Sequence, residues 1–297
     1  KKINFNDPKI KKFVGTYGLH GAILEVKLKL KKISSNCLKV NTIKFSSFEK
    51  CIALFNEFSN SNYVYMGAWI DHFSKKNKGI FKAAKWDKKF DEEIPKKIGN
   101  KKNFFFYIKT LFLYKIAKTF LINRYGIKFL NYFLYYLTKD KHNIHTNFFK
   151  FYYPQENILP EEWRLFPNGK VNIQILIDKK NPIKEFKRIH TICKKYNYES
   201  WWLGIKKHKK SKFNSFDGNG FDITLQWSKK HIGKSNFKYF YKELYRYINK
   251  NNYKIYLTQD ILLSSNSLRN NYLKSKINKN KFSKNFLFSN FLYERIF

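Results

Sequence analysis

The order of apolar segments between residues 171 and 257 constrains the fold of this chain more than any other feature. Two segments alternate apolar with polar residues, which is typical of strands with one buried face, and two others repeat apolar residues at helical spacing. In chain order the segments are Val171–Ile177 (strand), Pro182–Lys195 (helix), Trp201–Ile205 (strand), Gly220–Trp227 (strand), residues 237–248 (helix) and Lys254–Leu257 (strand). This order predicts an α+β fold in which helices cover one face of a large antiparallel sheet.

The first 103 residues contain weaker signals. Residues 45–58 predict a helix whose N-cap is Ser46 or Ser47, and Tyr63–Asp71 predicts a buried strand. In residues 13–30 a glycine-rich turn leads into an alternating segment that predicts another strand. The Lys-rich stretch from Asp71 to residue 103 lacks periodicity and is expected to be loop.

Residues 104–137 form the most hydrophobic part of the chain. Lys109, Lys115 and Lys118 interrupt it, so it contains no uncharged run of about 18 residues that could span a membrane. Two interpretations stay open. The segment is either a pair of core helices, which we favour, or a basic amphipathic surface that touches anionic lipid.

The charge of the chain is strongly positive. Its 297 residues include 60 Lys and Arg against 21 Asp and Glu, a formal net charge of +39. Such a charge suits nucleic acid or an anionic membrane. However, only six of the basic residues are Arg, the side chain that grips phosphate in a bidentate manner, and the lysines are spread from end to end. We therefore interpret most of them as a solvated surface and disfavour nucleic acid as the partner.

Cysteine and histidine patterns give little support for a metal or a disulfide. Cys37, Cys51 and Cys193 form no CxxC pair, and His142 and His145 have no third ligand nearby in the sequence. We expect no metal site and a reducing, cytoplasmic environment. No signal peptide opens the chain, which starts without Met as though inside a larger protein.

Polar residues within apolar strands are the best chemical candidates. Gln174 lies at the centre of one strand, and Asp222 and Thr224 lie in another. A polar group in such a place is costly unless it is paired, lines a cavity or faces solvent through simple alternation. The sequence leaves a site and a solvent-facing alternation equally open for Gln174.

Seven segments together resemble flavin-linked oxidases of the vanillyl-alcohol oxidase type, and most resemble the decaprenylphosphoryl-ribose 2′-oxidase branch. In order they are FVGTYGLHGAILEVKLKL from Phe13, YMGAWID from Tyr65, FYYP from Phe151, VNIQILI from Val171, WWLGIK from Trp201, the strand Phe221–Trp227 and IYLTQD from Ile255. The resemblance implies residues 1–32 as the end of an FAD-binding domain, residues 33–265 as a substrate or cap domain, and residues 266–297 as a segment that returns to the FAD domain.

The resemblance also implies roles for individual residues and FAD as the cofactor. Lys206, Gln174 and Gln259 would be catalytic, and Trp69, Tyr152, Asp222 and Thr224 would contact the substrate. The cofactor would contact Gly15, Gly18, Gly21, Ile23 and Tyr256. A sugar hydroxyl, for example on a pentose linked to polyprenyl phosphate, would be oxidised by hydride transfer to the flavin. A lipid-linked substrate would suit peripheral contact with the cytoplasmic membrane surface.

Two departures from the pattern bear on activity. Gln259 stands where this branch usually has Lys, and a neutral amide does not stabilise an anionic flavin as an ammonium does. Asp222 and Thr224 replace the usual Asn and Cys, which changes the hydrogen bonds beside the flavin. An aldonolactone oxidase is the first alternative, and a non-catalytic protein that binds nucleic acid is the second.

Overall fold

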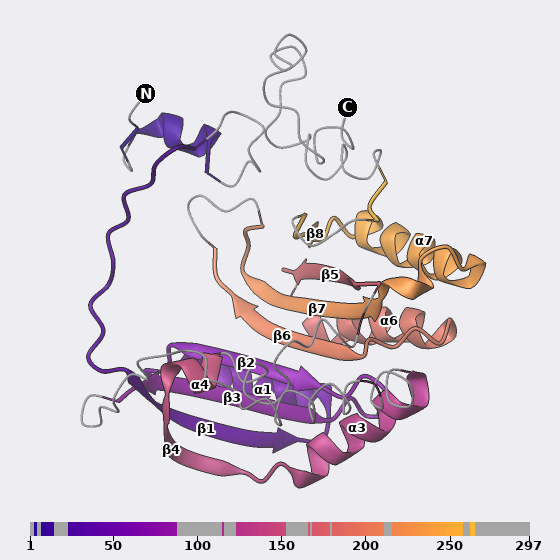
Figure 1. Ribbon diagram of the computed structural model, residues 1–297, viewed down its shortest axis with the longest axis horizontal. Coiled ribbons are helices and arrows are strands. Elements are labelled where there is room, and N and C mark those ends of the chain that lie inside the picture. The colour runs from indigo at the N-terminus through magenta and orange to yellow at the C-terminus, as the bar shows by residue number, and fades with distance from the viewer. Residues whose placement is uncertain are drawn as a thin grey trace.

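One antiparallel sheet of eight strands organises the computed structural model, in the order β4-β1-β3-β2-β6-β7-β5-β8 (Figure 1). The strands are β1 (Cys37–Phe45), β2 (Tyr65–Ile70), β3 (Gly79–Trp86), β4 (Lys141–Asn147), β5 (Lys170–Ile177), β6 (Trp202–His208), β7 (Gly220–Ser228) and β8 (Lys254–Ile255). The structure describes residues 3–4, 7–14, 23–87, 115, 123–152, 166, 168–178, 180–210, 216–257 and 262–264. The predicted α+β class and the large antiparallel sheet are confirmed. The division into three domains stays a prediction.

Five α-helices belong to the described residues, and three of them cover one face of the sheet. The helices are α1 (Phe48–Ser59), α3 (Arg124–Leu137), α4 (Phe148–Tyr152), α6 (Pro182–Lys195) and α7 (Ser235–Lys250), with short 3-10 turns at Pro8–Lys12 (η1) and Lys229–His231 (η4). The apolar sides of α1, α6 and α7 form a continuous buried core with alternate strand residues. Phe48 of α1 stacks on Phe186 of α6 with ring centroids 3.8 Å apart, so the helices also pack on each other.

Local capping explains where the predicted helices begin. The Ser47 hydroxyl accepts a hydrogen bond from the Lys50 backbone N–H at the start of α1, as the sequence predicts. At the start of α6 the Asn181 side chain accepts from the Lys184 N–H, and Pro182 occupies a first-turn position that needs no N–H donor. Both helices therefore begin within the predicted ranges.

The opposite face of the sheet carries a smaller aromatic cluster at the β1–β3–β2 end. Leu38, Val40 and Ala84 are buried there, and the rings of α4 pack over them beside two strand residues. Tyr65 and Trp86 hold ring centroids 5.9 Å apart in an edge-on arrangement, and Trp86 stacks on Phe148 at 5.5 Å. The remainder of this face mixes polar residues with apolar ones such as Ile80, Trp69 and Leu176.

Three sequence predictions are wrong in the described residues. Residues 23–30 form no strand, and every side chain in them is exposed, since none of the described strands pairs with them. The stretch expected to be loop contains β3, where Lys82 and Lys85 interrupt an otherwise apolar strand. The favoured core helices are contradicted for residues 124–137, because only Gly126 and Asn131 of α3 are buried.

Neither a membrane-spanning helix nor a cluster of metal ligands occurs in the described residues. No described helix is long and apolar enough to cross a bilayer. The described residues also contain no group of three or more His, Cys, Asp or Glu side chains suited to holding a metal ion. His142 and His145 instead belong to β4, where the His145 imidazole pairs with Asp87 at 2.5 Å.

Candidate functional site on the open face of the sheet

Five residues singled out from the sequence lie on the sheet face that α1, α6 and α7 leave uncovered. They are Trp69, Gln174, Lys206, Asp222 and Thr224. Their chain neighbours, such as Ile70, Ile175 and Ile223, are buried in the helix-covered core. Because successive strand residues point to opposite faces, these five side chains share the other face. Four different strands thus supply one surface.

Strand register arranges three of the five in a single cross-strand row. Trp69 on β2 lies opposite Gly204 on β6, Gly204 lies opposite Thr224 on β7, and Thr224 lies opposite Gln174 on β5. Directly opposite residues have Cβ atoms about 4.5–5.5 Å apart. The row therefore presents an indole, a gap, a hydroxyl and an amide in sequence.

A second row runs beside the first. Lys206 on β6 lies opposite Asp222 on β7, which lies opposite Leu176 on β5. The two rows are joined diagonally, because the Gln174 side-chain amide donates a hydrogen bond to the Asp222 carboxylate. We use the name sheet-face site for Trp69, Gln174, Gly204, Lys206, Asp222 and Thr224.

The Asp222 carboxyl has an unusual electrostatic environment. It is only 3% exposed, and burial raises its pKa above the ordinary value. The hydrogen bond from Gln174 and the electrostatic contributions of Lys206 and His208 act in the opposite direction, and burial prevails. Its Oδ1 atom is buried with no hydrogen-bond partner among the described residues. A buried oxygen of this kind is costly to keep unless a ligand or another protein surface uses it.

The centre of the first row is shaped by a residue without a side chain. A Cβ atom placed on Gly204 would meet nothing closer than Trp202 Nε1 at 3.7 Å, so room exists above this position. The indole of Trp69 borders the gap, and its Nε1 donor is buried with no partner among the described residues. The Trp202 ring centroid lies 6.2 Å from that of Trp69. The gap is therefore walled by indoles on one side and by Thr224 on the other.

Of two further predicted residues, Tyr256 lies beside this surface and Tyr152 does not. The Tyr256 backbone N–H donates to the Gln174 carbonyl at 3.0 Å, and the Tyr256 ring lies 5.5 Å from that of Phe216. Phe216 in turn contacts His208 at 5.4 Å. Tyr152 lies instead in the aromatic cluster, with its ring centroid 6.0 Å from that of Tyr65.

The remaining predicted residues are not brought to the site. Ile23 is 59% exposed in the extended stretch before β1. Gly15, Gly18, Gly21 and Gln259 lie outside the described residues, so their predicted roles stay predictions. The same holds for the segment 266–297.

Sequence reasoning missed one basic residue on this face. Lys82 on β3 lies opposite Gly67, two residues along β2 from Trp69, and its side chain is exposed. The alternation in GIFKAAKW could have revealed it, because Phe81 and Ala83 are buried on the helix-covered face. Lys82 and Lys206 give the open face two cations besides the carboxylate of Asp222.

None of the described helices α1, α6 and α7 covers the sheet-face site, and two hollows found in the described part of the chain lie elsewhere. A groove of about 1010 Å³ follows α7, lined by residues such as Tyr241 and Arg246. A smaller hollow of about 200 Å³ lies beside Arg124 and Glu199. Because ligand sites bury most of the ligand surface, the sheet-face site would need a second surface to enclose a small molecule.

Comparison with known proteins adds no assignment. No protein-family model matches the chain, and no curated protein sequence matches it. Functional inference therefore depends on the residues of the sheet-face site and on their geometry.

Proposed function

We propose that this chain is the substrate-covering part of an FAD-dependent oxidoreductase that oxidises a sugar hydroxyl. One observation carries the proposal. Trp69, Gln174, Lys206, Asp222 and Thr224, which the family resemblance assigns to one pocket, come from four strands and share one face. Because each strand residue points to one of two faces, residues on four independent strands would share a face only about one time in eight.

The chemistry of the sheet-face site suits a sugar. Gln174 and Thr224 offer amide and hydroxyl groups that donate to and accept from sugar hydroxyls. Trp69 offers an apolar wall for the less polar face of a sugar ring. Lys206 is exposed at the edge of the same surface, where its ammonium would neutralise a phosphate on the substrate as a point charge.

Asp222 is the residue best suited to receive the proton of the hydroxyl being oxidised. Its raised pKa brings it closer to neutral pH than an ordinary carboxyl, which favours general-base action. The Gln174 hydrogen bond holds one oxygen and leaves Oδ1 without a described partner. Asp222 would thus hold the proton at Oδ1 while Gln174 fixes the carboxylate in place.

The described residues fit the substrate side of a flavin site and not the phosphate side. Two buried polar atoms of the sheet-face site, Trp69 Nε1 and Asp222 Oδ1, have no hydrogen-bond partner among the described residues, and a polar ligand that reached them would supply one. When bound, the flavin would supply the acceptor for the hydride of the sugar carbon. Its pyrophosphate would be held outside the described residues.

Flavin binding and its reduction test the proposal. The flavin absorbance of the chain would be measured with FAD alone and with a co-expressed FAD-binding half, and anaerobic bleaching would be followed after adding a sugar. A phosphate-linked pentose and an aldonolactone serve as the two substrates. We expect bleaching by the phosphate-linked sugar, which Lys206→Met slows at least tenfold. Bleaching by the lactone alone would favour the aldonolactone oxidase alternative.

A matched control separates site effects from general charge loss. Lys238 is exposed on α7, so Lys238→Met removes one positive charge away from the sheet-face site. It is expected to leave the bleaching rate unchanged. If FAD is not retained even with the FAD-binding half, or if Lys206→Met and Lys238→Met behave alike, the proposed function is wrong.

A further inference from the structure

Helix α3 exposes an unusual amount of aromatic and aliphatic surface. Tyr125 is 83% exposed, Phe129 is 56% exposed and Leu137 is 74% exposed. The other exposed large residues of the helix are Leu130, Tyr132, Phe133, Leu134 and Tyr136. A helix on a globular domain normally turns such residues toward the core. Contiguous exposed apolar surface of this kind marks an interaction site.

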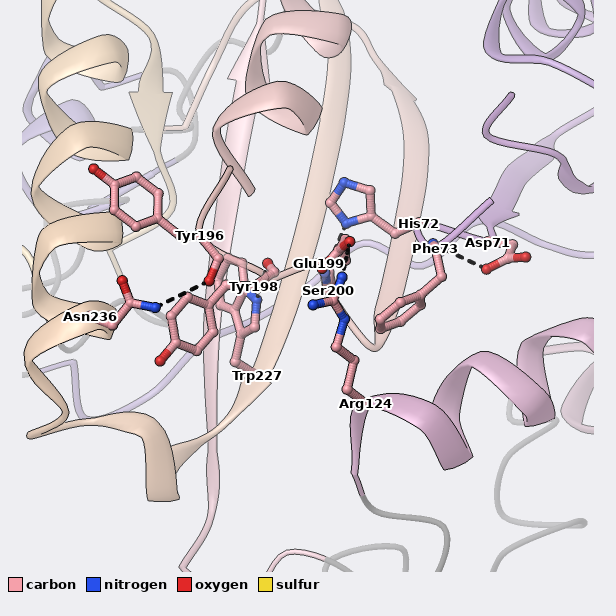
Figure 2. Close-up of polar contacts among 10 residues, drawn as sticks. All are labelled: Asp71, His72, Phe73, Arg124, Tyr196, Tyr198, Glu199, Ser200, Trp227 and Asn236. Atoms are coloured by element: carbon pink, nitrogen blue, oxygen red, sulfur yellow. Dashed lines mark hydrogen bonds and ion pairs between the residues drawn. The ribbon is translucent and has the colours of Figure 1, made fainter. Parts of the chain in front are cut away.

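Polar contacts hold α3 in this orientation. At its first residue the Arg124 guanidinium donates to Glu199 Oε1 at 2.7 Å, and the Glu199 side chain is only 6% exposed (Figure 2). About two turns further along the helix, the buried side-chain amide of Asn131 donates a hydrogen bond to Asp71 Oδ1 at 3.3 Å. Figure 2 shows Asp71 and Glu199 on the side of the protein that receives the helix. The side of α3 formed by Gly126, Ile127, Asn131 and Tyr135 thus faces the domain, and its other aromatic and aliphatic residues are left outward.

Lysine side chains surround the aromatic face. The Lys78 ammonium lies 4.3 Å from the ring centroid of Tyr136, and the Lys44 ammonium lies 4.5 Å from that of Tyr135. Lys128 and Lys139 are exposed in and just after the helix. The sequence of α3 contains no Asp or Glu. The surface therefore combines aromatic rings with cations and lacks acidic residues within the helix.

We infer that α3 docks this protein on a membrane surface that contains anionic phospholipids. Tyr and other aromatic side chains favour the level of the headgroups, and lysines around them attract anionic lipids. No described helix could cross the bilayer, so the contact is peripheral. We name the exposed residues of Tyr125–Leu137, which include Lys128, together with Lys44 and Lys78, the docking face. This inference does not depend on the proposed function.

Vesicle flotation of the full chain tests the inference. Vesicles of phosphatidylcholine alone are compared with vesicles that contain added phosphatidylglycerol. The double variant Phe129→Ser/Phe133→Ser removes two exposed rings, and Lys128→Glu reverses one charge. We expect each variant to lower binding to the anionic vesicles at least about fivefold. For Lys128→Glu, this is about the change in partitioning that one lysine near such a membrane produces.

The high net charge makes matched controls essential. Tyr239 is 64% exposed on α7, and Lys238 beside it is also exposed. Tyr239→Ser and Lys238→Glu therefore make the same kinds of change on another helix and are expected to leave binding within about twofold. If Lys238→Glu weakens binding as much as Lys128→Glu, attraction is diffuse and α3 is not the docking face.

A fluorescent label distinguishes lipid from protein as the occupant of α3. Cys37, Cys51 and Cys193 are all buried, and burial raises the pKa of the Cys51 and Cys193 thiols, so an exposed thiol at Phe133→Cys is labelled selectively. An environment-sensitive dye there is expected to shift to the blue only when anionic vesicles are added. A label that is already blue-shifted at low protein concentration shows that another part of the same chain covers α3. A shift that depends on protein concentration shows a second copy. Either result overturns the inference.

Discussion

The side-chain amide of Gln174 on β5 donates a hydrogen bond to the carboxylate of Asp222 on β7. The two residues are diagonal neighbours across the strands, because Gln174 lies opposite Thr224 and Asp222 lies opposite Leu176. The Gln174 side chain is partly exposed and paired with Asp222, so both alternatives for it, a functional site and a solvent-facing alternation, stay open. It also fixes Asp222 in a buried position where an ionised carboxylate is unfavourable.

Asp222→Asn is expected to raise the free energy of unfolding at neutral pH. The pKa of Asp222 is higher in the folded protein than in the unfolded chain, so the folded state loses stability as pH rises through that range. An amide of the same shape avoids this cost, and the expected gain is about 1 kcal/mol. Urea unfolding at pH 7 measures it. A loss of more than about 1 kcal/mol would show that the carboxylate stabilises the fold.

Two glycine substitutions are expected to differ sharply. A Cβ on Gly220 would collide with the Ile177 carbonyl of the adjacent strand, so Gly220→Ala should cost about 1–3 kcal/mol or more. At Gly204 a Cβ would lie 3.7 Å from Trp202 Nε1, an ordinary van der Waals distance, so Gly204→Ala should fold with nearly unchanged stability while narrowing the sheet-face site. Thermal unfolding measures both, and sugar-dependent flavin bleaching should be slowed in Gly204→Ala. Normal bleaching in a folded Gly204→Ala would remove the gap from the proposed site.

Acid is expected to destabilise the protein partly through two histidines that contact each other. The rings of His72 and His190 have centroids 4.7 Å apart, and the Ser200 N–H donates to His72 Nδ1 at 2.8 Å. Burial lowers the pKa of His190 to about 4, with a smaller contribution from Lys194, and it lowers the pKa of His72 well below its usual range. Both are therefore neutral in the fold at pH 7.

The unfolded chain binds protons on these histidines at higher pH than the folded protein does. Stability is therefore complete above about pH 6.5 and falls as pH decreases toward 4. His190→Gln should reduce this loss by roughly 1–3 kcal/mol at pH 4.5, measured as the difference between urea unfolding at pH 7 and at pH 4.5. His142→Gln, on the exposed edge strand β4, is the control and should follow the parent protein. Equal pH dependence in all three proteins would contradict the assignment.

Phe55→Ala is expected to cost about 3–5 kcal/mol of stability. Phe55 is fully buried between α1 and the sheet, and its ring makes edge contacts with Phe81 at 5.0 Å and Phe221 at 5.5 Å. Removing the ring leaves a cavity where helix and sheet meet. Tyr239→Ala on the exposed side of α7 should change stability by no more than about 0.5 kcal/mol. Chemical unfolding of the two variants provides the comparison.

The sequence by itself determined the elements whose pattern is local. Ser47 and Pro182 mark where two helices begin, and alternation locates β5 and β7, because capping and period-two burial depend on neighbouring residues. It also selected Gln174, Asp222 and Thr224 as candidates, since polar groups in apolar strands are visible without a structure.

Only the tertiary structure decided which strands pair and which faces are covered. The alternation in residues 23–30 predicted a strand that finds no described partner, whereas Lys-interrupted β3 pairs with both β1 and β2. Strand pairing requires hydrogen-bond partners far away in the chain, which local patterns do not specify. The same reason applies to α3, whose apolar residues predicted burial. Distant contacts of Arg124 with Glu199 and of Asn131 with Asp71 decide instead which side of the helix faces the domain.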